Sequence, residues 1–234
     1  MSTTTTATDP AGYWDRYASG VAEATPEEAL KTAFGWCQYD GHGPGDELLG
    51  DPATALELGS GRGNAVAALA TKGIAATGVD VSPAQCEKAH QRWGDLPGAE
   101  FVEADVVDYL AAAATAGRRW DAIYSIWAAA WFTDPEQLLP LVLDRLEPGG
   151  RLVFSHAPPV PGSYGAQGMY AQGFKGRRVW MYRWAYEPEE WTAILRGHGF
   201  VDVDVRVVAA PDPELVGTLI GTAHRDGARG VVGL

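Results

Sequence analysis

The chain has 234 residues, with 18 basic against 30 acidic side chains, so its formal net charge at neutral pH is −12. Such a surface repels phosphate backbones and anionic lipids, which argues against nucleic acids and membranes as partners. No apolar stretch reaches the roughly 20 residues that span a bilayer, and the polar start lacks the pattern of a signal peptide. The two cysteines, Cys37 and Cys86, are too few for a disulfide framework, and the composition predicts a cytoplasmic protein.

The length suits one α/β domain with additions. We predict this domain at residues 11–224, between mobile tails at 1–10 and 225–234, because the tails are polar or glycine-rich and no linker divides the middle. Near the start, Tyr13, Trp14 and Tyr17 follow helical spacing. The simplest interpretation of this aromatic face is a helix packed on the core.

Three helix starts share one pattern: a capping residue, then proline, then Glu or Gln at the third position after the cap. It occurs at residues 25–28, 82–85 and 134–137. A Ser, Thr or Asp cap accepts hydrogen bonds from the first free backbone N–H groups, and proline suits the first helical position. The pattern predicts helices from about 26, 83 and 135.

Short apolar runs rich in branched residues lie between these helices, at 54–58, 74–79, 100–103, 121–126 and 151–155. Runs without alternation are typical of strands buried on both faces, and strands that alternate with helices predict a parallel sheet. The final two runs, 200–208 and 216–223, leave no room for a helix between them. Because a short connection makes an antiparallel pair, the sheet is expected to end with one antiparallel strand.

A glycine-rich turn follows the first predicted strand in the stretch LELGSGRGN. The glycines at 59 and 61 suit a turn that approaches a ligand closely, but Asn64 stands where a dinucleotide site has its third glycine. This departure, with the reversed last strand, argues against a dehydrogenase. Asp80 ends the second strand, where a carboxylate accepts hydrogen bonds from ribose hydroxyls. Asp105, after the third strand, suits an adenine amino group, although both acids are also ordinary helix-capping residues.

The sequence resembles the class I S-adenosylmethionine-dependent methyltransferases over roughly residues 50–224. The resemblance rests on LELGSGRG, GVDVSP, EADV, LEPGGRLVF and the reversed last strand, in that order. It implies the three-layer Rossmann-like fold of that family, α/β with a seven-stranded, mostly parallel sheet and an antiparallel last strand. It also implies a helical lid at 11–50 and an acceptor-recognition insertion at 157–186.

The resemblance further implies which residues form the site. The cofactor is S-adenosylmethionine, which leaves as S-adenosylhomocysteine, and no metal is expected. Residues expected at the cofactor are Tyr13, Tyr17, Glu57, Gly59, Ser60, Gly61, Asn64, Asp80, Val81, Gln85, Asp105, Val106 and Ser125. Arg62 departs from the common pattern, and two interpretations remain open: it binds the donor's carboxylate, or it points to solvent.

The acceptor side is expected to be aromatic. Residues expected to bind the acceptor are Trp127, Trp131, Tyr164, Tyr170 and Tyr182. His156 ends the fifth strand and is the candidate general base for a hydroxyl or carbon acceptor, whereas a neutral amine needs little help. A structural role for this histidine remains the alternative.

The function expected is direct, in-line transfer of a methyl group to nitrogen or oxygen of a small molecule. The segment SIWAAAWF lacks the Pro-Pro-aromatic motif of nucleic-acid amino-methylating relatives, and it lacks the acidic pair of an aminopropyltransferase. The alternative from another class is a regulatory module that binds S-adenosylmethionine without catalysis.

Overall fold

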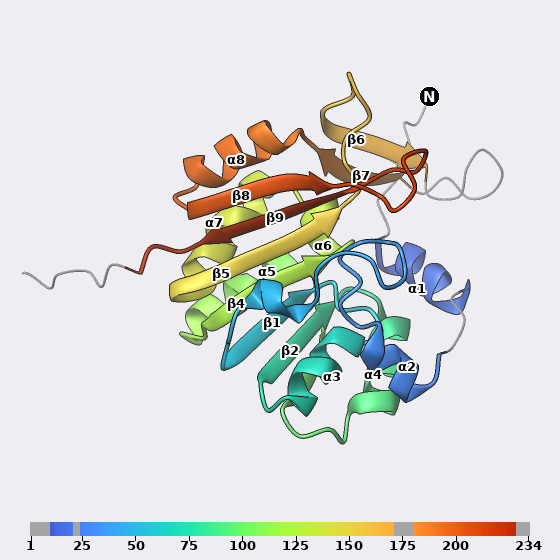
Figure 1. Ribbon diagram of the computed structural model, residues 1–234. Helices are drawn as coiled ribbons and strands as arrows, with labels where there is room; N and C mark the ends of the chain where they lie inside the picture. The colour runs from blue at the N-terminus through green and yellow to red at the C-terminus, as the bar shows by residue number, and fades with distance from the viewer. Residues whose placement is uncertain (1–9, 21–23, 171–179, 228–234) are drawn as a thin grey trace, which may run out of the picture.

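The computed structural model describes residues 10–20, 24–170 and 180–227 (Figure 1). A sheet of seven strands runs through the molecule in the order β3-β2-β1-β4-β5-β9-β8. Its strands are β1 (Thr54–Leu58), β2 (Ala75–Asp80), β3 (Ala99–Glu103), β4 (Trp120–Ile126), β5 (Leu146–His156), β8 (Val201–Val208) and β9 (Thr218–His224). The first five pair in parallel, and β9 lies antiparallel to both β5 and β8. The predicted fold, with its reversed last strand, is confirmed.

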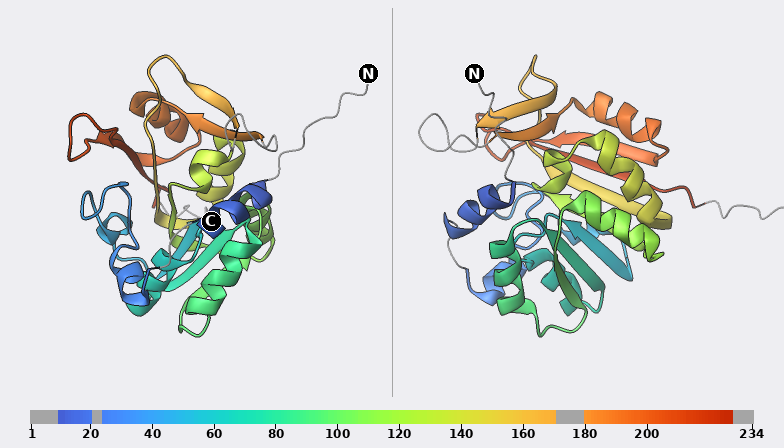
Figure 2. Two further views of the ribbon diagram at one scale, coloured as in Figure 1. Left: turned by 90° about the vertical axis from the view of Figure 1, so that its right-hand side faces the viewer. Right: turned by 180° about the vertical axis from the view of Figure 1, so that it is seen from behind.

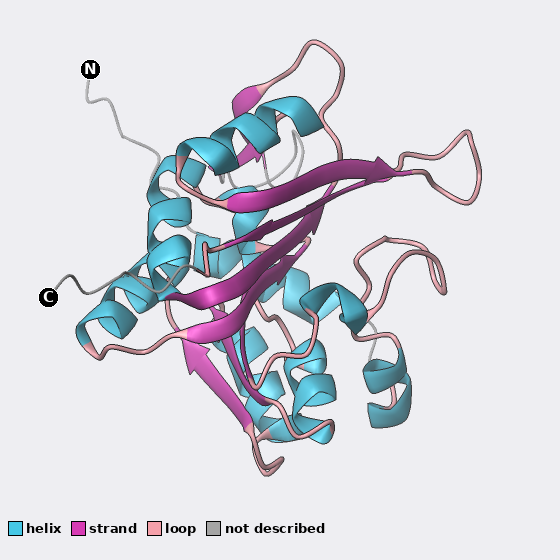
Figure 3. Ribbon diagram, turned by 60° about the vertical axis from the view of Figure 1, so that its left-hand side comes forward, coloured by secondary structure: helices cyan, strands magenta, loops and turns pink. Residues whose placement is uncertain are grey.

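Helices cover both faces of this sheet (Figures 2 and 3). They are α1 (Pro10–Gly20), α2 (Pro26–Lys31), α3 (Asn64–Thr71), α4 (Pro83–Trp93), α5 (Val106–Thr115), α6 (Ala129–Phe132), α7 (Pro135–Arg145) and α8 (Pro188–Gly197), with a short 3₁₀ helix at Asp46–Leu49. One core cluster joins α5, α7 and α8 to one face, around buried Leu56 and Phe154. A second cluster joins α2, α3 and α4 to the other face, around Ala55 and Val153. The result is a three-layer sandwich with two apolar cores.

The predicted helix starts at 26, 83 and 135 are confirmed, and each has its side-chain cap. Thr25 accepts from the Glu28 N–H, and Glu28 reaches back to the Thr25 N–H in a full capping box. Ser82 accepts from the Gln85 N–H, and Asp134 accepts from the Glu136 N–H. These caps fix where α2, α4 and α7 begin, and α4 then leads directly away from the end of β2.

A two-stranded antiparallel sheet, β6 (Gly165–Tyr170) with β7 (Trp180–Ala185), lies within the predicted insertion at 157–186. These strands were not predicted: the glycines of β6 weaken its strand signal, although the aromatic residues of β7 are typical of strands. Figure 1 shows this hairpin beyond the ends of β4 and β5, near α6. Most of each predicted tail, residues 1–9 and 228–234, lies outside the described residues, while Pro10 already belongs to α1. Within the described ranges, no helix is long and apolar enough to cross a membrane.

Candidate functional site

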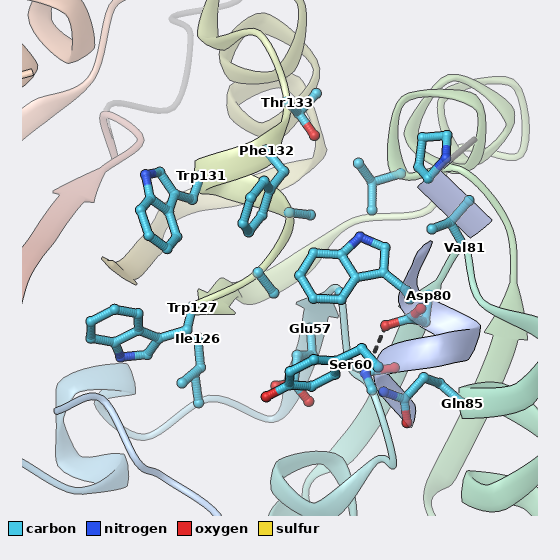
Figure 4. Close-up of a pocket in the computed structure, with 18 of the residues that line it drawn as sticks. Glu57, Ser60, Asp80, Val81, Gln85, Ile126, Trp127, Trp131, Phe132 and Thr133 are labelled. Carbon is cyan, nitrogen blue, oxygen red and sulfur yellow. Dashed lines mark hydrogen bonds between the residues drawn. The ribbon is translucent and has the colours of Figure 1, made fainter. Parts of the chain in front are cut away.

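A pocket of about 640 Å³ opens at the carboxyl ends of β1, β2 and β4 (Figure 4). This volume is within the range of small-molecule sites, about 300 to 1,000 Å³. From β1 the chain builds the sheet outward in one direction through β2 and β3, and then continues on the other side of β1 with β4 and β5. Ligands of open α/β sheets bind at such a switch point. We call one side the turn half, lined by Glu57, Gly59, Ser60, Gly61, Asn64, Asp80, Val81, Gln85, Asp105 and Val106.

The opposite side of the pocket follows β4 and includes β7. We call it the aromatic half, lined by Ile126, Trp127, Ala128, Ala129, Trp131, Phe132, Thr133, Met181, Tyr182 and Trp184. Figure 4 shows Trp127 and Trp131 across the pocket from Asp80 and Gln85. A third wall is helix α1, which contributes Tyr13, Trp14 and Tyr17. The aromatic face of α1 thus lines the pocket, and a lid at 11–50 stays a prediction.

The glycine turn is shaped by backbone constraints. The N–H groups of Gly59 and Ser60 both donate to the Val79 carbonyl, over 2.8 and 3.0 Å, so the turn is tied to β2. Gly59 has φ of +80°, and a Cβ there would lie 2.6 Å from the Cβ of Ala128. Only glycine fits where the turn meets the segment after β4. The turn therefore presents backbone rather than side chain to the pocket.

Asp80 connects the turn to the end of β2. Its Oδ2 accepts from the Gly61 N–H over 2.8 Å, and its Oδ1 accepts from the Ser82 N–H over 2.9 Å. A carboxylate has about four acceptor positions, so capacity remains for a ligand's hydroxyl groups. Burial raises the pKa of Asp80, although the backbone N–H groups of Ser82, Gly61 and Val81 oppose that effect. Beside it, the buried Oε1 of Gln85 has no hydrogen-bond partner among the described residues. An unsatisfied acceptor here suits a ligand that brings a donor.

Glu57 lies behind the turn and is 5% exposed. Burial raises its pKa well above the usual value, and the charge of Asp80 raises it further. The Tyr124 hydroxyl, 3.5 Å away, opposes this shift weakly. Glu57 therefore holds its proton over a wider pH range than an exposed glutamate.

Asp105 has two roles in the structure, both considered from sequence. Its Oδ1 caps α5 by accepting from the Val107 N–H over 2.8 Å. The same residue lines the pocket beside Val106 and Val81. A cap and a pocket wall are thus compatible, because only one carboxylate oxygen is used by the helix.

Helix α1 is held against the turn half by polar contacts at two places. Asp15 Oδ1 accepts from the Ser82 hydroxyl over 2.5 Å and from the Ala84 N–H over 3.1 Å. The Ala18 carbonyl accepts from Arg62 Nη2 over 2.9 Å and from Lys88 Nζ over 3.0 Å. Arg62 thus donates to α1, which neither interpretation of this residue foresaw. Cations at a helix C-terminus are favourable because the last carbonyls lack partners.

Trp127 begins the aromatic half in an unusual backbone conformation, with φ of +53°. Its indole N–H donates to the Trp36 carbonyl over 2.7 Å, and its backbone N–H donates to the Ser155 carbonyl over 2.9 Å. Positive φ is rare for a bulky residue and clusters at functional sites. The two hydrogen bonds hold the ring in place, with Trp131 edge-on at 5.8 Å between ring centroids.

Two predicted residues are in the core instead of the pocket. The Ser125 hydroxyl donates to the Leu58 carbonyl over 2.9 Å and accepts from the Ala130 N–H, which joins β1 to α6. His156 is fully buried and stacks on Trp131 at 5.5 Å between ring centroids. Burial lowers the pKa of His156 to about 4, so the ring is neutral near pH 7. The expectation that His156 faces the methyl group is therefore not met, because its ring points into the core among Phe154 and Trp191.

Of the remaining acceptor-side predictions, Trp127, Trp131 and Tyr182 line the pocket. Tyr164 lies outside it and is 47% exposed. Tyr170 belongs to β6, and its side chain lies outside the described part of the structure. The acceptor-side residues expected from sequence did not include several lining residues, chiefly Ala128, Ala129, Met181 and Trp184. Their only signal is proximity in sequence to Trp127 and Tyr182.

Comparison with known proteins agrees with this geometry. Residues 56–154, from β1 to β5, match the family described as "Methyltransferase domain". This part of the chain is therefore similar to a methyltransferase domain. The match includes the glycine turn, Asp80 and Asp105, which carry the resemblance in the sequence.

Curated relatives are similar to this chain over part of their length. A trans-aconitate 2-methyltransferase of Paracidovorax citrulli is 37% identical over 116 residues, which cover 47% of this chain and 42% of the relative. The chain thus spans less than half the length of the curated relatives it matches.

Solved structures resemble nearly the whole chain. The complex of DhpI with S-adenosylhomocysteine has a TM-score of 0.63 at 21% identity, covering 94% of this chain and 96% of that one. The 1,6-didemethyltoxoflavin-N1-methyltransferase of Burkholderia thailandensis, with 1,6-didemethyltoxoflavin and S-adenosylhomocysteine bound, has a TM-score of 0.59 at 22% identity, covering 92% and 84%. At these identities the likeness establishes the fold.

Proposed function

We propose that this chain transfers a methyl group from S-adenosylmethionine to a small-molecule acceptor by direct in-line displacement. The observation that carries the proposal is the position of Asp80. Its carboxylate organises the glycine turn through Gly61 and faces a pocket at the switch point of a methyltransferase domain.

Each part of the turn half suits one part of the donor. The spare acceptor capacity of Asp80 fits the ribose hydroxyls. Asp105 with Val81 and Val106 fits an adenine ring, since a carboxylate accepts from its amino group and apolar walls cover its faces. The Gly59–Gly61 turn, with Ser60 and Asn64, remains for the methionine portion. Tyr13 and Tyr17, on the wall formed by α1, close this half of the pocket.

A small molecule is the acceptor that the pocket and the charge favour. The formal net charge of −12 repels nucleic acids. The aromatic half faces the turn half across the pocket, so an acceptor enclosed there is positioned against the donor, and positioning can contribute ~7 to 11 kcal/mol when alignment is ideal. The cytoplasm is the compartment we propose, supported by the two free, buried cysteines.

The experiment is an assay of S-adenosylhomocysteine release in the presence of a library of amines, heterocycles, phenols and carboxylic acids, including trans-aconitate. Release that depends on one acceptor, and that disappears in Asp80→Ala, supports the proposal. Binding of S-adenosylhomocysteine with no transfer to any acceptor, even in a fractionated metabolite extract, contradicts it and favours a regulatory module.

A further inference from the structure

The aromatic half of the pocket has a composition that restricts the acceptor. Five of its side chains are aromatic rings: Trp127, Trp131, Phe132, Tyr182 and Trp184. None of its lining residues in the described ranges is acidic or basic. Its polar groups are the hydroxyls of Thr133 and Tyr182 and the indole N–H groups of its three tryptophans, of which that of Trp127 already donates to the Trp36 carbonyl. Such walls enclose a flat, largely apolar molecule and offer hydrogen bonds at few points.

Among the described residues, no histidine or carboxylate faces this half. All five histidines of the chain belong to the described residues, and none lines the pocket. His156 contacts a lining residue, Trp131, but it lies behind that ring, and its Nδ1 is 2.7 Å from the Ala157 carbonyl. The carboxylates of the pocket all belong to the turn half. The described aromatic half therefore offers no base to an acceptor hydroxyl that must lose its proton during attack.

Anionic acceptors fit no better. Burying a carboxylate requires a cation or several donors to replace its hydration. Arg62 is the cation of the described lining, and its Nη2 donates to the Ala18 carbonyl. Arg183 lies over the Trp131 ring, 5.4 Å from its centroid, with Nε donating to Gln167, but it does not line the pocket. The described lining also holds three carboxylates, those of Glu57, Asp80 and Asp105, so its formal charge is negative despite Arg62.

Aliphatic amines meet a different obstacle. A simple alkylamine has a pKa near that of lysine, about 10.4, so it is protonated at neutral pH and has no free lone pair. It would need a protein base to become a nucleophile. A ring nitrogen or an amino group conjugated to an aromatic ring is weakly basic and already carries its lone pair.

We infer that the acceptor is a flat, uncharged nitrogen heterocycle or aromatic amine, methylated on nitrogen without a protein base. The inference rests on the proposed function. In the step, the nitrogen lone pair forms the new N–C bond while the C–S bond of the donor breaks, and sulfur keeps the electron pair. Where the attacked nitrogen carried a hydrogen, the N-methylated cation then loses that proton to water. Contacts with the rings of Trp127, Trp131 and Tyr182 orient the heterocycle for the attack.

The test measures binding of probes to the full chain loaded with S-adenosylhomocysteine. Loading is established first by calorimetry, and its failure contradicts the proposed function rather than the acceptor class. Saturation-transfer NMR then compares three probe sets: pteridines, quinolines and aminopyrimidines; trans-aconitate and citrate; and spermidine. Lys175, Arg177 and Arg178 belong to the insertion but lie outside the described residues. The binding of the acids is therefore measured directly and not inferred from the charge of the described lining.

Two tyrosines give a matched pair of variants. Tyr182 lines the pocket and is 49% exposed, while Tyr164, one residue before β6, is 47% exposed and does not line it. We expect a heterocycle to bind, and Tyr182→Ala to weaken it about five- to ten-fold, since an aromatic pair contributes ~1 kcal/mol beyond its burial. Tyr164→Ala should leave the affinity unchanged. Preferential binding of the acids or of spermidine, no heterocycle binding, or equal effects of the two variants would overturn the inference.

Discussion

The guanidinium of Arg62 donates a hydrogen bond to the backbone carbonyl of Ala18, over 2.9 Å. One residue belongs to the glycine turn and the other to helix α1, which covers the pocket. Lys88 donates to the same carbonyl, and Asp15 of α1 accepts from the start of α4. These contacts join the covering helix to the strand ends, so we expect α1 to control how fast a bound ligand leaves.

The cleanest test of this control is Lys88→Gln, because Lys88 does not line the pocket and can act only through α1. A charge-assisted hydrogen bond at a partly exposed site contributes ~1 kcal/mol, about a factor of five. We therefore expect S-adenosylhomocysteine to dissociate about three- to ten-fold faster from Lys88→Gln, and at least as fast from Arg62→Gln, in stopped-flow fluorescence. Lys31→Gln on exposed α2 is the control. A Lys88→Gln variant that releases ligand at the wild-type rate would show that α1 is not held in this way.

Two glycines with the same backbone conformation separate strain from close contact. Gly59 and Gly73 have φ of +80° and +83°, but a Cβ at Gly73 meets nothing within 4 Å. In both alanine variants, positive φ lowers the free energy of unfolding by ~1 kcal/mol. Gly59→Ala also drives Ala128 and Ala129 away from the turn, so we expect a further loss of ~2 kcal/mol in urea unfolding. It should also lose most ligand affinity. Similar unfolding free energies for the two variants would contradict the packing described for the turn.

Much of the sheet and the turn half could be predicted, because both depend on local chemistry. Apolar runs mark buried strands, and caps such as Thr25 act on adjacent residues. Other features depend on contacts between distant segments. The Arg62 bond ends on a backbone carbonyl, which has no residue-type signature. His156 sits at a strand end, where either face was possible, and packing with Trp191 decided it.

Glu57 makes stability fall as pH rises. Burial raises its folded-state pKa well above 4.5, so the unfolded chain releases this proton first. The folded state then binds more protons than the unfolded state, and the free energy of unfolding decreases from about pH 4.5 up to the raised pKa. We expect Glu57→Gln, which resembles the protonated acid, to show a flatter dependence in calorimetric melting curves. An unchanged slope in this variant would mean that Glu57 ionises normally.

His156 contributes to the pH dependence of stability with the opposite sign. Its pKa is lowered from 6.5 to about 4, so the unfolded chain takes up a proton that the folded core excludes. Stability from this group is complete above about pH 6.5 and is lost as pH falls toward 4, by up to ~3 kcal/mol. His156→Phe keeps a ring of similar shape and should reduce this acid sensitivity in urea titrations. It should leave ligand affinity near that of the wild type, whereas a large loss of affinity would place His156 in the site.

We propose that this pocket binds S-adenosylmethionine and its product through Asp80. Calorimetric titration with S-adenosylhomocysteine tests it, with Asp80→Ala compared with Asp95→Ala, which removes the same charge from an exposed loop. Hydrogen bonds to a charged group contribute ~1.5 to 3 kcal/mol, so Asp80→Ala should bind at least about ten-fold more weakly. Circular dichroism checks that both variants are folded. We expect one site in the wild type and in Asp95→Ala; no binding to the intact protein, or equal affinity of the two variants, would contradict the claim.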